Sequence, residues 1–291
     1  MYSYILSTKK FPCGIPTCVD GYKEAELALY LLNVNAYARL KEDGYPILPN
    51  SQSLDGGMFG ADGEWFSLEE VCAITSVDLP LFLQNYEVDV PFEELIDETL
   101  YWSHSIDGAT YFKPLVDILY TKRKQFKGKP QQRFYKKLLE VLPGHFEMIE
   151  YGGGFWKKDF KPSDSKDVKF YNPKIGIFIT AYGRQLLNSL VHLCPHDKVI
   201  GCDTDSIHYA GTPEELPPAL LALFGDQPGQ LHLDGYYRNV THEAAKRYYG
   251  IDTATGEPFR KMAGESKSGK AWHWNWEKQE YELKEINYEK R

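Results

Sequence analysis

The hydrophobic and polar positions between Lys198 and Gly211 form the most informative pattern of the chain. Two short runs rich in β-branched and aromatic residues flank a polar bend, which predicts a strand, a turn and a second strand. Asp203 and Asp205 stand in the bend, on either side of Thr204. Side chains at positions i and i+2 of an extended segment point to the same face, so we expect the two carboxylates to converge. The alternative is a polar turn with two solvated aspartates.

Other periodic segments surround this bend. An apolar, β-branched run at 176–180 comes before helical spacing from Arg184 to Leu193. An amphipathic helix is predicted to end at Pro143 and Gly144, and a short helical pattern covers 219–224. Aromatic residues alternate with polar ones from Trp272 to Tyr281, which is typical of a half-buried strand. The chain therefore mixes helices and strands.

Composition limits the classes of protein that remain. With 291 residues, of which 43% are hydrophobic, the chain can bury a core in one large or two smaller domains. No apolar run approaches bilayer length, and the first residues lack the pattern of a signal peptide. Five cysteines without a C-x-x-C pair favour free thiols. These features predict a protein of the reducing cytoplasm with no membrane partner.

The charge is unevenly distributed. The net charge of -8 opposes binding to phosphates, yet residues 121–137 contain no acidic residue. This basic run predicts phosphate contact, and the alternative is a solvated helix face. Its basic members are Lys122, Arg123, Lys124, Lys127, Lys129, Arg133, Lys136 and Lys137. Of these, we expect Lys122, Arg123 and Lys124 to bind DNA.

The residues GCDTDSIHY, from Gly201 to Tyr209, resemble motif C of family B DNA polymerases, and most closely the protein-primed branch of phages and plasmids. The resemblance implies that Asp203 and Asp205 are catalytic and hold two Mg²⁺ or Mn²⁺ ions, with Thr204 near the nucleotide. The block NPKIGIFITAYGRQLL, which contains Arg184, resembles the segment that precedes motif C in this family. Arg184 is accordingly expected to bind DNA.

The residues KKLLEVLPGHF resemble motif B, the fingers helix of the same family, and imply that Lys136 binds the incoming nucleotide. The departures from the motif are Glu140, Val141, Pro143 and His145. Glu140 lies one helical turn beyond Lys136 and would repel a triphosphate. Pro143 stands where the motif has a tyrosine, so the flat ring on which a base could stack is missing. Further along, AAKRYYGI resembles the K-x-Y motif, which implies that Lys246 and Tyr248 contact the primer strand.

The resemblance implies an α+β fold, with a palm of antiparallel strands and packed helices, fingers helices, an insertion subdomain and a shortened thumb. The expected regions are palm at 1–60, an insertion resembling the terminal-protein-contacting region at 61–115, fingers at 116–150, a second insertion loop at 151–170, palm with motif C at 171–235 and a thumb-like region at 236–291. No D-x-x-S-L-Y-P segment, motif A, occurs in the sequence, so the two-metal site is expected to be incomplete in this chain. A split subunit, a truncated gene and a decayed relative all fit this pattern.

The expected activity is DNA-directed DNA synthesis in the bacterial host of a phage or plasmid, once the missing carboxylate is supplied. The expected partners are primer-template DNA, deoxynucleoside triphosphates, a terminal protein and an upstream polypeptide that carries motif A and the exonuclease. One alternative is an inactive polymerase-like module that binds DNA or a terminal protein. Another is a haloacid-dehalogenase-like phosphatase, in which Asp203 attacks phosphate and Asp205 protonates the leaving group.

Overall fold

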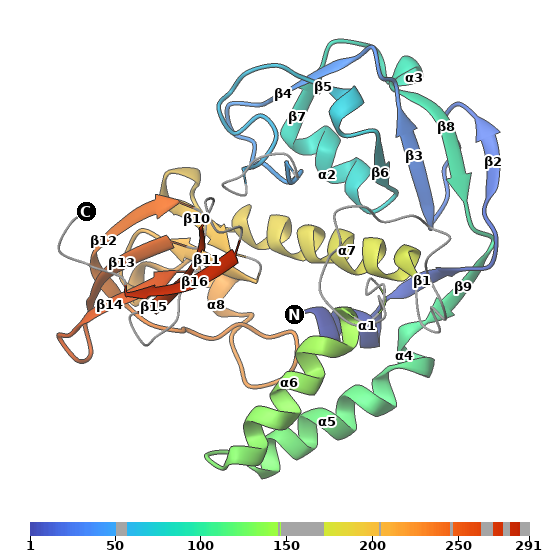
Figure 1. Ribbon diagram of the computed structural model, residues 1–291. Coiled ribbons are helices and arrows are strands. Elements are labelled where there is room, and N and C mark those ends of the chain that lie inside the picture. The colour runs from blue at the N-terminus through green and yellow to red at the C-terminus, as the bar shows by residue number, and fades with distance from the viewer. Residues whose placement is uncertain are drawn as a thin grey trace.

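A long helix, α7 (Pro173–Val191), runs through the middle of the molecule and separates its parts (Figure 1). The computed structural model describes residues 1–50, 57–144, 146, 172–203, 205–244, 247–262, 270–275 and 280–285. Residues of α7 that are spaced three and four apart, such as Ile175, Phe178 and Ile179, are buried. Its first half includes the β-branched run 176–180. The predicted start of this helix near Arg184 was therefore wrong, because packing along one face outweighs local strand propensity.

Two antiparallel sheets lie on one side of α7 (Figure 1). The first has four strands in the order β2 (Thr17–Asp20), β8 (Ile96–Tyr101), β3 (Ala28–Leu32) and β6 (Ala73–Thr75). The second has three, in the order β5 (Phe66–Ser67), β4 (Tyr37–Leu40) and β7 (Tyr86–Val88). Alternate residues of β3 are buried, as expected for a strand with one face on a core. Helix α2 (Asp78–Asn85) joins this core through Phe82 and also contacts α7.

Short elements complete this half of the molecule. They are α1 (Tyr2–Thr8), β1 (Lys10–Cys13), the 3-10 turn η1 (Leu68–Glu70), α3 (Phe92–Leu95), β9 (His104–Asp107) and α4 (Gly108–Tyr111). Strands β1 and β9 pair with each other, and α1 packs against α4 and α7. A second core, which includes Ile5, Leu6 and Phe11, joins these elements to the buried face of α7.

Helices α5 (Lys113–Gln125) and α6 (Pro130–Gly144) form an antiparallel hairpin that projects from the rest of the molecule (Figure 1). Val116, Leu119 and Leu139 form a small core between the two helices. Helix α6 ends at Gly144, one residue after Pro143, which confirms the predicted stop.

The C-terminal part consists mostly of antiparallel strands. A hairpin of β10 (Val199–Asp203) and β11 (Ser206–Tyr209) follows the 3-10 turn η3 (His196–Lys198). After η4 (Pro213–Glu215) and α8 (Pro218–Leu221) comes a sheet of β12 (Tyr237–Ala244), β13 (Arg247–Asp252) and β14 (Pro258–Met262). The single strand predicted from Trp272 to Tyr281 is instead two strands, β15 (Lys270–Asn275) and β16 (Glu280–Glu285), which pair as a hairpin.

These elements confirm the expected α+β class, because every named strand ladder of the described residues is antiparallel and helices pack beside the sheets. Each of the two sheets beside α7 contains strands from the expected first region, 1–60, and strands from the expected insertion, 61–115. Among the described residues, no helix is long and apolar enough to span a bilayer.

Candidate functional site

The predicted strand, turn and strand around the two aspartates are present. Cys202 pairs with Ile207, and Asp203 pairs with Ser206, so the turn between β10 and β11 has two residues. This turn places Asp205 at the tip of the hairpin, directly before β11 and two residues after Asp203, which ends β10. Thr204, Lys246 and the surroundings of the Asp203 side chain lie outside the described residues. The backbone therefore places the two predicted aspartates at one hairpin tip.

Asp205 is accessible and already faces a positive charge. Its side chain is 58% exposed, and its Oδ2 lies 3.7 Å from the amino nitrogen of Met1. Helix α1 brings Met1 to the hairpin, and Ser3 on the same helix donates a hydrogen bond to the carbonyl of Leu139 in α6. Helix α1 thus joins the hairpin to α6. This contact was missed by sequence reasoning, because no local pattern links residue 1 to residue 205.

The donor chemistry at this tip fits a hard divalent cation, since carboxylate oxygens are the ligands that Mg²⁺ and Mn²⁺ prefer. The number of donors is small. Within the described part of the chain, no three His, Cys, Asp or Glu side chains gather as they would around a metal ion. The metal site expected at Asp203 and Asp205 stays a prediction.

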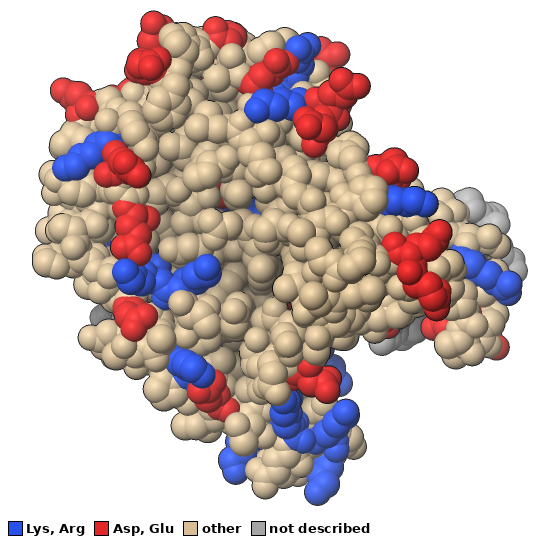
Figure 2. All heavy atoms as spheres, turned by 180° about the vertical axis from the view of Figure 1, so that it is seen from behind, with Lys and Arg blue, Asp and Glu red and all other residues tan. Residues whose placement is uncertain are grey.

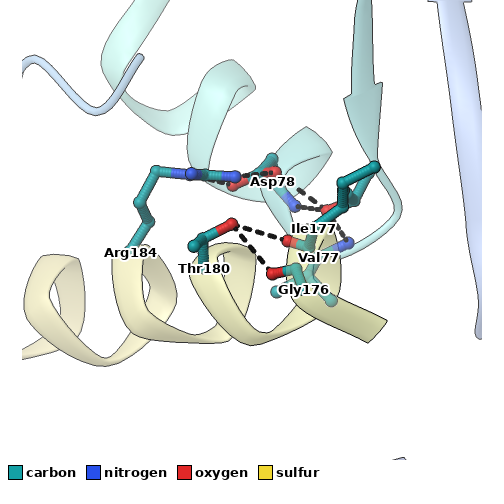
Figure 3. Close-up of polar contacts among 7 residues, drawn as sticks. Val77, Asp78, Gly176, Ile177, Thr180 and Arg184 are labelled. Atoms are coloured by element: carbon teal, nitrogen blue, oxygen red, sulfur yellow. Dashed lines mark hydrogen bonds and ion pairs between the residues drawn. The ribbon is translucent and has the colours of Figure 1, made fainter. Parts of the chain in front are cut away.

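Arg184 connects α7 to α2 in a buried ion pair. Its Nε donates to Oδ1 of Asp78 at 2.8 Å, and its Nη2 donates to Oδ2 at 2.7 Å (Figure 3). Asp78 is 2% exposed and also accepts a hydrogen bond from the hydroxyl of Thr75. This two-point contact uses the planar fork of the guanidinium. In this structure Arg184 therefore anchors the helix that leads to the hairpin, and its expected contact with DNA stays a prediction.

A second polar cluster lies near the C-terminal end of α7. Asn85, which is fully buried, donates to Oδ1 of Asn188 at 3.0 Å and accepts from the backbone nitrogen of Tyr45 at 2.7 Å. The Nε2 of His192 lies 3.3 Å from Oδ1 of Asn85. Burial lowers the pKa of His192, and the neighbouring His196 acts in the same direction while Asp43 opposes it. The sequence offers one signal for this cluster, since Asn188 and His192 are one helical turn apart.

The basic residues of the 121–137 run gather on the α5–α6 hairpin, which forms the lower protrusion in Figure 2. Lys122, Arg123 and Lys124 form the last turn of α5. The Nζ of Lys122 donates a hydrogen bond to Oε1 of Gln125 at 3.2 Å. The Nζ of Lys124 lies 4.8 Å from the centre of the Tyr120 ring. The structure therefore collects the basic residues on one projecting element, as a phosphate-binding surface requires.

Lys136 lies on α6 and is 57% exposed. Its Nζ is 3.7 Å from Oε1 of Glu140, whose other oxygen is 3.7 Å from Nζ of Lys137. The acidic residue that departs from motif B is therefore next to the lysine it was expected to oppose. In this arrangement Glu140 partly neutralises the charge that a triphosphate would meet.

Tyr248 lies on β13 and is 7% exposed. Its ring centre is 4.6 Å from that of His208 on β11 and 5.2 Å from that of His242 on β12. The residue predicted to contact the primer therefore packs against the strand that follows Asp205. Its role in DNA binding stays a prediction.

Comparisons with known proteins agree with these features. No family model matches the chain. The DNA polymerase of Bacillus phage Nf is 29% identical over 231 residues, and that of Bacillus phage phi29 is 26% identical over 242 residues. These matches cover 73% and 76% of this chain but 37% of each relative. The chain thus spans little more than a third of the length of the curated relatives it matches.

Solved structures extend the similarity over more of the chain. The phi29 DNA polymerase in complex with primer-template DNA and incoming nucleotide substrates matches with a TM-score of 0.70 and 20% identity, over 92% of this chain and 49% of that chain. Its orthorhombic crystal form matches with a TM-score of 0.69 over 92% of this chain and 50% of the other. The comparisons confirm the expected resemblance, since the chain is similar in sequence and in fold to phi29-like, protein-primed DNA polymerases of family B.

Proposed function

We propose that this chain takes part in DNA-directed DNA synthesis as the portion of a phi29-like polymerase that carries two metal-binding aspartates. The observation that carries the proposal is the hairpin tip with Asp203 and Asp205, in a fold that matches a polymerase complexed with DNA and nucleotides. In the proposed reaction, the hydroxyl of a primer attacks a nucleoside triphosphate in line with the leaving pyrophosphate. Positioning and charge neutralisation are then the tasks of the protein.

Asp203 and Asp205 would hold Mg²⁺ or Mn²⁺, which supplies positive charge to the developing phosphate oxygens when it is bound. The carboxylate of Asp205 is 58% exposed, which supports a position that a cation can reach. Two divalent ions carry four positive charges, so a third carboxylate from outside these residues is part of the proposal. It would come from a segment with the D-x-x-S-L-Y-P pattern.

The remaining assignments follow the surfaces described above. Lys136 would contact the triphosphate, with Thr204 nearby. Primer-template DNA would lie against the basic α5–α6 hairpin, through Lys122, Arg123 and Lys124, and against Lys246, Tyr248 and Arg184. A terminal protein would be the primer in the protein-primed mode, and an upstream polypeptide would carry the exonuclease. The proposed location is the cytoplasm of the bacterial host.

A second candidate function is an inactive polymerase-like module that binds DNA or a terminal protein. The contact between Lys136 and Glu140 favours it, because it weakens the charge available to a triphosphate. The phosphatase alternative lacks comparable support. It requires its aspartates on a parallel, Rossmann-like sheet, whereas β10 pairs antiparallel with β11.

Primer extension tests the proposal. The chain is incubated with a primer-template, the four deoxynucleoside triphosphates and Mg²⁺ or Mn²⁺, with and without a polypeptide that carries the D-x-x-S-L-Y-P segment. We expect template-directed extension when that polypeptide is present, and a loss of at least about a hundredfold in Asp205→Asn, because even the outer partners of metal ligands are worth 10- to 100-fold.

Each other outcome identifies an alternative. DNA binding without extension, unchanged in Asp205→Asn, supports the inactive module. Hydrolysis of a simple phosphate ester without template supports the phosphatase.

A further inference from the structure

We propose that His208, His242 and Tyr248 form an aromatic bracket that holds the strand after Asp205 against the β12–β14 sheet. In this proposal His242 is a positioning residue, which acts on Asp205 through Tyr248 and His208. The effect on catalysis rests on the proposed function, whereas the packing of the three rings does not depend on it.

The bracket starts from a row of side chains across the sheet. His242 on β12 and Lys261 on β14 are the cross-strand partners of Tyr248 on β13. Cross-strand partners lie side by side on one face of a sheet. The ring of His242 is accordingly stacked on that of Tyr248, with an angle of 19° between the planes. The Nζ of Lys261 lies 5.7 Å from the centre of the Tyr248 ring.

His208 inserts into this row from a different element. It lies on β11, in the hairpin whose tip carries Asp205. Its ring is 4.6 Å from that of Tyr248, at 65°, and 4.9 Å from that of His242, at 47°. Edge-to-face and tilted ring pairs at these distances are attractive. His208 thereby joins the hairpin to a sheet that begins at residue 237.

The same packing limits what Tyr248 can do for nucleic acid. With 7% of the residue exposed, its ring is enclosed by the two histidines and by Phe259, whose ring centre is 6.0 Å away. A base or a sugar needs an open ring surface for stacking. The ring faces of Tyr248 therefore serve the position of the hairpin, and the proposed contact of this residue with the primer would not involve stacking.

The position of His208 explains why the bracket matters for the site. Only Ser206 and Ile207 separate His208 from Asp205, and β11 pairs with β10 directly up to Asp203. Because the backbones of β10 and β11 are hydrogen-bonded to each other, the two strands and the turn between them form one unit, so we expect a shift of His208 to reach Asp205. Metal ligands must be held within about 0.5 Å of their productive geometry, so a looser β11 displaces the carboxylate of Asp205.

Hydrogen exchange of the free chain tests the bracket without any enzymatic assay. In His242→Ala, which removes an exposed ring, we expect amides of β10 and β11 to exchange about two- to tenfold faster, the range that one aromatic pair is worth. His242→Phe retains the stacked ring and should exchange as the wild type does. His232→Ala is the matched control, because His232 is also exposed and lies outside the bracket.

Tyrosine variants provide an independent comparison. Tyr248→Phe keeps the ring and should leave exchange in β10 and β11 unchanged, whereas Tyr248→Leu should accelerate it. Tyr249→Leu controls for the loss of a tyrosine from β13, since Tyr249 is 40% exposed and points to the other face. Unchanged exchange in His242→Ala, or equal acceleration in His232→Ala, overturns the bracket.

Steady-state kinetics then test the link to catalysis. In the primer-extension assay, His242→Ala should lower kcat two- to tenfold with an unchanged KM for primer-template, and His242→Phe should restore kcat. A raised KM with unchanged kcat overturns the positioning role, because it indicates lost DNA contact. If the wild type does not extend primers, the proposed function fails, while the exchange data still decide whether the bracket exists.

Discussion

The ion pair between Arg184 and Asp78 should respond very differently to the removal of its two partners. Arg184→Met removes both hydrogen bonds from a carboxylate that is 2% exposed, so that Oδ1 of Asp78 loses its partner inside the protein. Asp78→Asn leaves a guanidinium whose side chain is 24% exposed and can reach water. A stranded buried charge is costly, whereas a charge at the surface is not.

The burial of the two partners sets the magnitudes. Removal of one partner of a buried pair costs about 3–5 kcal/mol, which we expect for Arg184→Met. For Asp78→Asn we expect a loss of about 1–2 kcal/mol, since an amide keeps part of the hydrogen bonding. In a chain of this size, the Arg184→Met loss corresponds to a Tm lower by roughly 6–20 °C. The double variant should be more stable than Arg184→Met alone, because the buried charge is gone.

Urea unfolding at pH 7 of the wild type, both single variants and the double variant measures these differences as a double-mutant cycle. Arg184→Lys should fall between the wild type and Arg184→Met, because an ammonium retains the charge and loses the fork. The reasoning is refuted if Asp78→Asn costs as much as Arg184→Met, or if the double variant is less stable than either single variant.

Three further predictions concern other parts of the chain. Gly108→Ala should lower the free energy of unfolding, measured in urea, by about 1–3 kcal/mol or more, because a Cβ there would lie 2.2 Å from the carbonyl oxygen of Leu6. Gly144→Ala is the control, since a Cβ at Gly144 would have no neighbouring atom within 4 Å. Glu140→Gln should lower the KM for nucleotide about two- to fivefold in primer extension, since it frees Lys136, and an unchanged KM would remove Lys136 from the nucleotide site. Burial raises the pKa of Tyr182 to about 12, so the contribution of Tyr182 to stability should be full below pH 10 and be lost as the pH rises towards 12. Stability should fall less steeply with pH in Tyr182→Phe, and tyrosinate absorbance and circular dichroism measure the difference.

The parts of the fold that sequence predicted are those with local causes. The hairpin of β10 and β11 has two short strands and a two-residue turn, so alternation and a polar bend within a few residues are sufficient to predict it. The end of α6 also has a local cause, because Pro143 has no backbone N–H to donate and its ring crowds the preceding turn, so the helix ends one residue later.

The parts that sequence did not predict depend on distant contacts. The β-branched run at 176–180 is helical because the apolar face of α7 packs on the core that contains Ile5, Leu6 and Phe11, and no local window contains that information. Asp78 and Arg184 are 106 residues apart, and Met1 contacts Asp205, which lies in the last third of the chain. Neither contact can be predicted from the spacing of residues along the chain or from its composition.

The candidate site divides in the same way. The resemblance to motif C drew attention to Asp203 and Asp205, and the basic composition drew attention to residues 121–137, while the roles of both stay predictions. The burial of Tyr248 between two histidines could not be foreseen, because it depends on how β11 meets a sheet formed later in the chain.

Single-nucleotide incorporation opposite each of the four template bases tests the central claim most directly. The assay contains Mg²⁺ or Mn²⁺ and a polypeptide that supplies the third carboxylate, and it compares the wild type with Asp203→Asn and Asp205→Asn. A polymerase site at the β10–β11 hairpin predicts addition of the complementary nucleotide alone, and loss of addition in both variants. Addition that ignores the template base, or that survives both substitutions, would contradict the account.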